Sequence, residues 1–122
     1  MSQESFESIA AKLALNEEKK QVAATLVLLN PDLLIAQYPN SKAIASAAED
    51  LLKNGNSIVA KNRFASAAKL ALYEGDPVSA KKYLERLVSI DQSSPYGSVL
   101  SNFDDFSRFA DEFYKKKAGR MS

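Results

Sequence analysis

The stretch SIVAKNRFASAAKLALYEGDP, residues 57–77, decides the fold class of this 122-residue chain. Apolar residues recur in it at spacings of three and four, which is the period of an amphipathic helix. They predict one buried face that consists of Ala60, Phe64, Ala67, Ala68 and Ala71. Alanines on that face let a neighbouring helix approach closely. Gly75 then favours a helix end, and Asp76-Pro77 favours a new start with a capping side chain followed by proline.

The same period extends outward along nearly the whole chain, and the alternation typical of strands is almost absent. We therefore expect helices over residues 3–15, 16–29, 31–38, 41–54, 57–74 and 77–90 and from about residue 102 onward, with a loop over residues 91–101. This pattern predicts an all-α fold of six or seven short helices stacked as antiparallel hairpins. Both an open superhelix and a compact bundle fit the pattern. Residues 1–118 are expected to form a single domain, followed by a flexible tail at 119–122.

The composition excludes several classes of site. Sixteen Lys and Arg residues stand against fifteen Asp and Glu residues, which gives a net charge of +1, and the chain has neither Cys nor His. Disulfides, Cys/His zinc sites, thiolate nucleophiles and Ser-His-Asp triads are therefore impossible. The sequence holds no EF-hand loop, phosphate-binding glycine loop or metal-binding helix signature. We expect a protein that is not an enzyme and that needs no cofactor.

No stretch is typical of a signal peptide or of a membrane-spanning helix. The opening residues are polar and acidic, whereas a signal peptide begins with basic residues followed by an apolar core. The most apolar stretch, residues 22–36, is interrupted by Asn30-Pro31-Asp32 and is shorter than the roughly 20 residues that a membrane helix requires. We expect a cytoplasmic protein, and the absence of cysteine suits that reducing compartment.

The hexapeptide AAKLAL occurs twice, at residues 10–15 and again at residues 67–72. Identity at a fixed offset is a sign of internal duplication. A chance match is the alternative, because the chain is rich in alanine and leucine.

Residues 61–91 resemble a single tetratricopeptide repeat, a helix-turn-helix unit of 34 residues. The matching positions are an early aromatic residue, a small residue four positions later, a Gly-Asp turn, a small and an aromatic residue in the second helix, and an Ile-Asp ending: Phe64, Ala68, Gly75-Asp76, Ala80, Tyr83 and Ile90-Asp91. The chain departs from the family at Ala67, Ala71 and Leu87, where Leu, Tyr and Ala are usual. The resemblance covers about a quarter of the chain and implies a module that binds proteins.

Four polar positions on the central predicted helix are the candidate site residues. Asn62, Ser66, Lys69 and Tyr73 follow one another at i, i+4, i+7 and i+11, on the side opposite the alanines. In the resembled family the first helix of each hairpin lines a groove for a partner peptide. The resemblance therefore implies that these four residues contact a protein or peptide, in a non-catalytic interaction module or scaffold. The alternative interpretation is the ordinary solvated face of an amphipathic helix.

Other segments suggest alternative roles. Phe103, Phe106, Phe109 and Phe113 recur at helical spacing, which indicates either core packing or a face that forms a structural homodimer. Lys115-Lys116-Lys117 and Arg120 could make a weak contact with nucleic acid, although lysines at a helix C-terminus also complement the helix dipole. Because the net charge is so small, we do not expect nucleic acid as the main partner. In the predicted loop, Tyr96 either presents an aromatic ring to a partner or packs over its neighbours.

Overall fold

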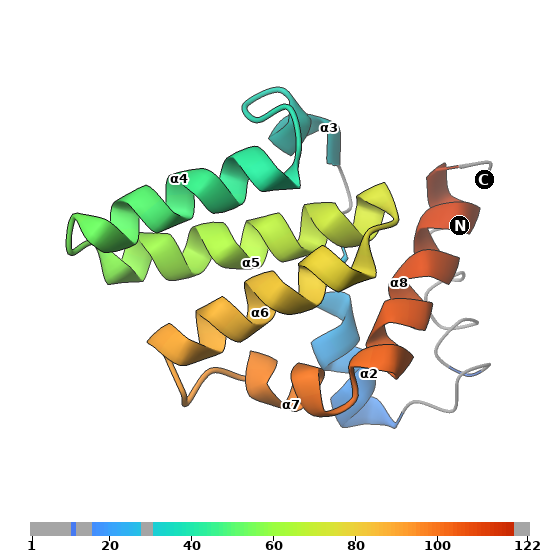
Figure 1. Cartoon of the computed structure of the whole chain (residues 1–122). Coiled ribbons are helices and arrows are strands. Elements are labelled where there is room, and N and C mark those ends of the chain that lie inside the picture. Colours follow the sequence, from blue (N-terminus) through green and yellow to red (C-terminus); the bar gives the residue numbers. More distant parts are fainter. Residues whose placement is uncertain (1–10, 12–15, 28–30, 119–122) are drawn as a thin grey trace.

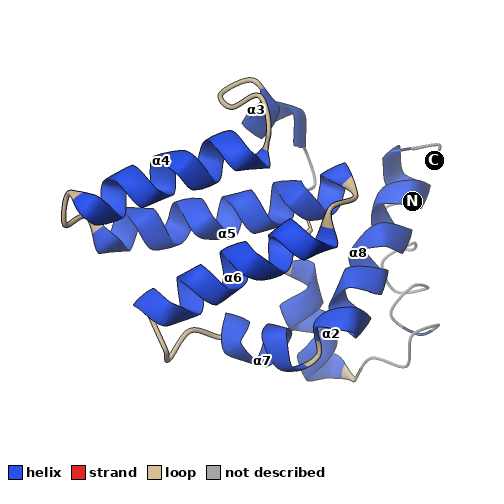
Figure 2. Cartoon of the chain, viewed as in Figure 1, coloured by secondary structure: helices blue, strands red, loops and turns tan. Residues whose placement is uncertain are grey.

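The computed structural model describes residue 11 and residues 16–27 and 31–118 of the chain. Within these ranges the backbone forms seven helices and no strand (Figures 1 and 2). The helices are α2 (Glu17–Ala24), α3 (Pro31–Ile35), α4 (Ser41–Lys53), α5 (Ser57–Glu74), α6 (Pro77–Ile90), α7 (Tyr96–Ser101) and α8 (Phe103–Ala118). The all-α prediction is therefore confirmed, and the helices pack together as a compact bundle.

Helix α5 is the centre of the bundle. α4 and α6 pack along it and run antiparallel to it, so that α4–α5 and α5–α6 are two consecutive hairpins (Figure 1). α8 crosses beside the C-terminal half of α5 and also contacts α2 and α7. The predicted stacking of antiparallel hairpins is thus present around α5, which lies between the other long helices.

Local capping explains why several helices begin and end where the sequence predicts. The side-chain oxygens of Asn16, Asn40 and Asp76 accept hydrogen bonds, at 2.8–3.1 Å, from the backbone N–H groups three residues later. These bonds satisfy donors that the first helical turn leaves without partners. α5 ends at Gly75, whose φ of +82° is accessible to glycine at little cost. The Asp76 N–H then bonds to the Ala71 carbonyl at 2.9 Å, which closes the turn into α6.

Three predicted boundaries were wrong. The predicted helix over 16–29 ends at Ala24, and the Thr25 hydroxyl donates to the Val22 carbonyl at 2.6 Å in the turn that follows. The helix predicted over 31–38 ends at Ile35. The loop predicted over 91–101 contains α7, because Val99 is fully buried in the core and a helical turn places it there. The Pro, Gly and Ser residues of this segment are typical of a loop, so the sequence pattern did not indicate a buried helix.

Other predictions fall on residues outside the described ranges. They are the first helix over 3–15 together with the first AAKLAL copy (except Ala11), the Asn30 cap and the tail at 119–122.

The alanine-rich face of α5 divides between two hydrophobic cores. On one side Phe64, Ala67 and Leu70 pack with α4 and with Leu87 of α6. On the other side Ala68, Ala71 and Leu72 join a larger core formed with α2, α6, α7 and α8. Consecutive residues on a helix point about 100° apart, so Ala67 and Ala68 face different neighbours. The predicted single face is therefore a seam between two packing surfaces.

An ion pair on the surface links α6 to α4 across α5. The Arg86 guanidinium bonds to both carboxylate oxygens of Glu49, at 2.7 and 2.8 Å, and lies 5.7 Å from the centre of the Phe64 ring. The hydrogen bonds from Arg86 lower the pKa of the Glu49 carboxyl. Because both side chains are partly exposed, the pair contributes little stability. Its two hydrogen bonds form a bidentate link between α4 and α6.

A second link joins the end of α5 to the start of α4. The two carboxylate oxygens of Glu74 accept hydrogen bonds from the Ser41 N–H at 3.0 Å and from the Ser41 hydroxyl at 2.6 Å. Ser41 is only 4% exposed. With the carboxylate in place, water has little access to these two donors.

Glu74→Ala is expected to lower the free energy of unfolding by about 1–3 kcal/mol, because it leaves two donors of a buried serine without their partner. Urea denaturation of the two proteins measures the difference. Glu85→Ala is the matched control: Glu85 is an exposed glutamate on α6, and its loss is expected to change stability by less than about 0.5 kcal/mol. Equal midpoints for the wild type and Glu74→Ala would contradict a stabilising role for this link.

In the described part of the chain, no helix is both long enough and apolar enough to cross a bilayer.

Candidate interaction site on helix α5

A hollow of about 410 Å³ lies between α5 and the segment that connects α6 to α7. α5 forms one wall, and the end of α6 and the start of α7 form the other. The lining side chains are Lys61, Asn62, Ala65, Ser66 and Lys69 from α5, and Leu87, Asp91, Ser94, Pro95 and Tyr96 from the other wall. Three of the four predicted site residues, Asn62, Ser66 and Lys69, therefore share one hollow.

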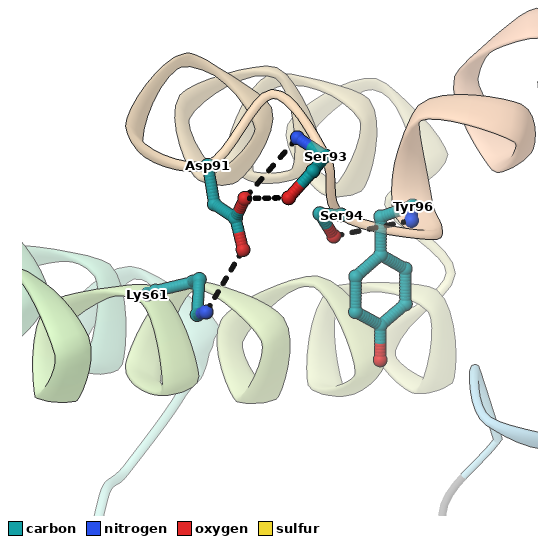
Figure 3. Close-up of polar contacts among 5 residues, drawn as sticks. All are labelled: Lys61, Asp91, Ser93, Ser94 and Tyr96. Atoms are coloured by element: carbon teal, nitrogen blue, oxygen red, sulfur yellow. Dashed lines mark hydrogen bonds and ion pairs between the residues drawn. The ribbon is translucent and has the colours of Figure 1, made fainter.

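Asp91 holds the two walls together at the residue that ends α6. Its carboxylate accepts hydrogen bonds from the Lys61 ammonium at 3.0 Å and from the N–H and hydroxyl of Ser93 at 3.1 and 2.7 Å (Figure 3). The Ser93 hydroxyl, and next the Lys61 ammonium, hold the pKa of the Asp91 carboxyl below its usual range. Asp91 is therefore ionised at neutral pH, and Lys61 already has a counter-ion.

Tyr96 belongs to the far wall of the hollow, which is the wall formed by the end of α6 and the start of α7. Its backbone N–H donates to the Ser94 hydroxyl at 3.2 Å, which fixes the turn into α7, and its side chain extends toward α5 (Figure 3). The ring is half-buried and packs against both hydrophobic cores. Tyr96 thus packs over the neighbouring helices while it also lines the hollow.

Lys69 is the charged residue of this hollow that has no counter-ion within the described part of the chain. Its side chain is half-buried, and no carboxylate in the described part of the chain forms an ion pair with it. Burial alone lowers the pKa of the Lys69 ammonium, because removal from water disfavours the charged form. The structure therefore places a partly desolvated cation in a hollow that is open to solvent.

Tyr73, the fourth predicted residue, lies apart from the hollow. Its half-buried ring meets the Tyr114 ring of α8 edge to face, with 5.1 Å between centroids and an angle of 81°. Eleven residues make slightly more than three full helical turns, so Tyr73 does follow the stripe that begins at Asn62. It also lies about 16 Å further along the axis, where α8 crosses α5.

The sequence-based prediction missed the far wall of the hollow. Asp91, Ser94 and Tyr96 come from a segment some thirty residues away in the chain, and only tertiary packing brings them to α5. Asp91-Gln92-Ser93 did carry one local signal, since aspartate commonly bonds to the backbone two residues later in a turn. That signal predicts the turn but not the helix against which the turn packs.

The Phe-rich face of α8 packs inside the protein. Phe103, Phe106, Phe109 and Phe113 are between 0 and 8% exposed, and they belong to the core shared with α2, α5, α6 and α7. A homodimer through this face would require α8 to leave that core. The side chains of Lys115–Lys117 and residue Arg120 lie outside the described part, so the nucleic-acid alternative stays a prediction.

A larger trench of about 910 Å³ lies between α6 and α8. Apolar Val78 and Phe103 line it together with three cations and two acids, Lys81, Lys82, Arg108, Glu85 and Asp104. All five of these charged residues are exposed, whereas Lys69 in the hollow is partly buried. Elsewhere in the described ranges, no group of three or more Asp and Glu side chains is placed to hold a metal ion. The hollow on α5 is therefore the candidate site.

Comparisons with known proteins identify no relative of this chain. The sequence matches no protein-family model and no curated protein, and the fold matches no solved structure.

Proposed function

We propose that this protein is a non-catalytic interaction module, a helical-hairpin unit similar to a tetratricopeptide repeat, that receives a segment of a partner protein in the hollow on α5. One observation supports this most directly: Lys69 is a half-buried ammonium with no ion pair in the described part of the chain, and it faces a hollow with braced walls. A partner that supplies the missing counter-ion would recover the interactions that Lys69 loses on leaving water.

The composition of the walls supports a binding role. Pro95 and Tyr96 offer apolar area, while Asn62 and Ser66 offer hydrogen bonds that orient a ligand. Asp91, the carboxylate among the lining residues, is bonded to Lys61 and Ser93, so it is poorly suited to act as a general base. The wall is also stiff, because its bonds are made before any ligand arrives, and stiff walls reduce the entropy lost on binding.

Lys69→Glu is expected to weaken partner binding at least about tenfold, because a carboxylate then replaces the cation that the partner's anion is proposed to contact. A partner is first captured by crosslinking from an extract of the source cells and identified by mass spectrometry. The affinity of the purified pair is then measured by isothermal titration calorimetry.

Lys42→Glu is the matched control, because Lys42 is an exposed lysine on α4, outside the lining of the hollow, and the charge change is the same. This variant is expected to bind like the wild type. Equal affinities for the wild type and Lys69→Glu would overturn the assignment of the interface to this hollow. Tyr73 is a poor test position, because truncating it also removes a core contact.

A further inference from the structure

We propose that the hollow on α5 is a binding site for a single carboxylate carried on an apolar stem, with Lys69 as its counter-ion. This inference deepens the proposed function and rests on it for the identity of the ligand's carrier. It follows from the charges, donors and apolar surfaces that line the hollow.

The first argument is that Lys69 would be stabilised by a bound anion. Lys69 is partly removed from water, and in the described part of the chain no carboxylate pairs with it. Ser66 lies three residues before Lys69, on the same side of α5, so its hydroxyl and the ammonium are neighbouring donors. A group with two acceptor oxygens matches two adjacent donors, and a carboxylate is such a group.

The second argument is the charge of the residues that line the hollow, which indicates the charge of the ligand. Lys61 also lines the hollow, but Asp91 already holds its ammonium at 3.0 Å. The Asp91 carboxylate is ionised and forms part of the same wall, so it repels any anion that enters. Because Lys61 and Asp91 neutralise each other, Lys69 leaves a net charge of +1 among the lining residues, which suits a ligand of charge −1. A phosphate group, with a charge near −2 at neutral pH, suits it less.

The third argument is that the hollow has apolar surface that suits an apolar stem on the ligand. Ala65, Pro95 and the Tyr96 ring provide apolar surface around the donors. The volume of about 410 Å³ falls within the range of pockets that take small organic groups. A short aliphatic chain that ends in a carboxylate therefore fits both the charge and the surface of the hollow.

The test is an NMR titration of the ¹⁵N-labelled full chain with hexanoate, hexanamide and inorganic phosphate. Hexanoate is expected to shift the amide signals of Asn62, Ser66, Lys69, Ser94 and Tyr96 saturably, with millimolar affinity. Hexanamide has the same stem without the charge and is expected to bind about tenfold more weakly, and phosphate is expected to bind more weakly than hexanoate.

Two variants locate the charge. Lys69→Met keeps the aliphatic stem of the lysine and removes its ammonium, so it is expected to weaken hexanoate binding about tenfold while hexanamide binding stays unchanged. Lys42→Met, at an exposed position on α4, is expected to match the wild type. Equal binding of hexanoate and hexanamide, equal hexanoate binding by Lys69→Met, tighter phosphate binding or no saturable shift at tens of millimolar would each overturn the proposal.

The same variants separate this inference from the proposed function and distinguish a free acid from a protein as the carrier. If Lys69→Met binds the captured partner as tightly as the wild type, the carboxylate site is overturned, although the module still binds a protein. If hexanoate binds as expected but does not compete with any captured partner, the carrier is a small acid and the proposed protein-binding role of the hollow is overturned. Competition between hexanoate and the partner supports both.

Discussion

Replacing Phe109 with alanine is expected to lower the free energy of unfolding by about 3–5 kcal/mol. Phe109 is 0% exposed and lies on the face of α8 that packs into the larger core. Its ring is stacked on that of Phe113, with 6.4 Å between centroids, and Phe113 in turn meets Tyr114 edge to face at 5.6 Å. The substitution removes the apolar ring and leaves a cavity that rigid neighbours cannot fill.

Urea denaturation measures this effect, and an unchanged m-value shows that the compactness of both states is preserved. Phe109→Leu fills more of the cavity and is expected to cost less than the alanine variant. Val78→Ala is the surface control: Val78 is 67% exposed, and the change is expected to stay within about 0.5 kcal/mol. A loss under about 1 kcal/mol for Phe109→Ala would contradict the docking of α8 on the core.

The size of this effect also bears on the alternative homodimer. Domains of this kind have total stabilities of about 5–15 kcal/mol, so Phe109 alone accounts for a substantial share. The Phe-rich face of α8 is buried within one chain, so a second copy could use it only after α8 left the core.

Ala68→Leu is the second large expected effect, with a loss of about 1–3 kcal/mol. Ala68 is 0% exposed on the side of α5 that faces the larger core. A leucine there must displace neighbours or leave its preferred rotamer, because the alanine seam is closely packed. Alanine and leucine have similar helix propensities, so the loss reports packing and not helix formation.

Ser46→Leu is the control for overpacking, because it places the same large side chain on α4 at a position that is exposed to solvent. It is expected to change stability by less than about 0.5 kcal/mol. Thermal unfolding followed by circular dichroism compares the variants, and Ala68→Leu is expected to melt several degrees lower than the wild type. Identical melting temperatures for Ala68→Leu and the wild type would contradict the close packing around Ala68.

Several features of the fold were predictable because their causes are local. The end of α5 and the start of α6 follow from Gly75 and Asp76-Pro77, which act on the backbone within a few residues. The end of α2 at Ala24 and the helix α7 were not predictable in this way. α7 depends on the burial of Val99 against distant helices, and this outweighs the turn preference of Pro95 and Gly97.

The residues of the candidate site also divide into those that a local pattern predicted and those that only tertiary packing brought to the site. The polar stripe of Asn62, Ser66 and Lys69 was predictable, since it needs only the helical period of one segment. The assignment of Tyr73 to the same surface required knowing where α8 crosses α5, which no local pattern contains. The far wall, which includes Asp91 and Tyr96, also required the α5–α6 hairpin to be closed.

The sequence by itself determined that residues 57–77 form the end of one helix and the start of the next, because capping and helical period act over a few residues. It also determined that α5 would be packed closely, because its alanines leave room for neighbours. Only the tertiary structure decided that the alanine face divides between two cores and that Lys69 is half-buried in a hollow without an ion pair in the described chain. The physical reason is that burial and charge pairing depend on residues far apart in the chain, such as Lys61 and Asp91, whose meeting is a property of the whole packed fold.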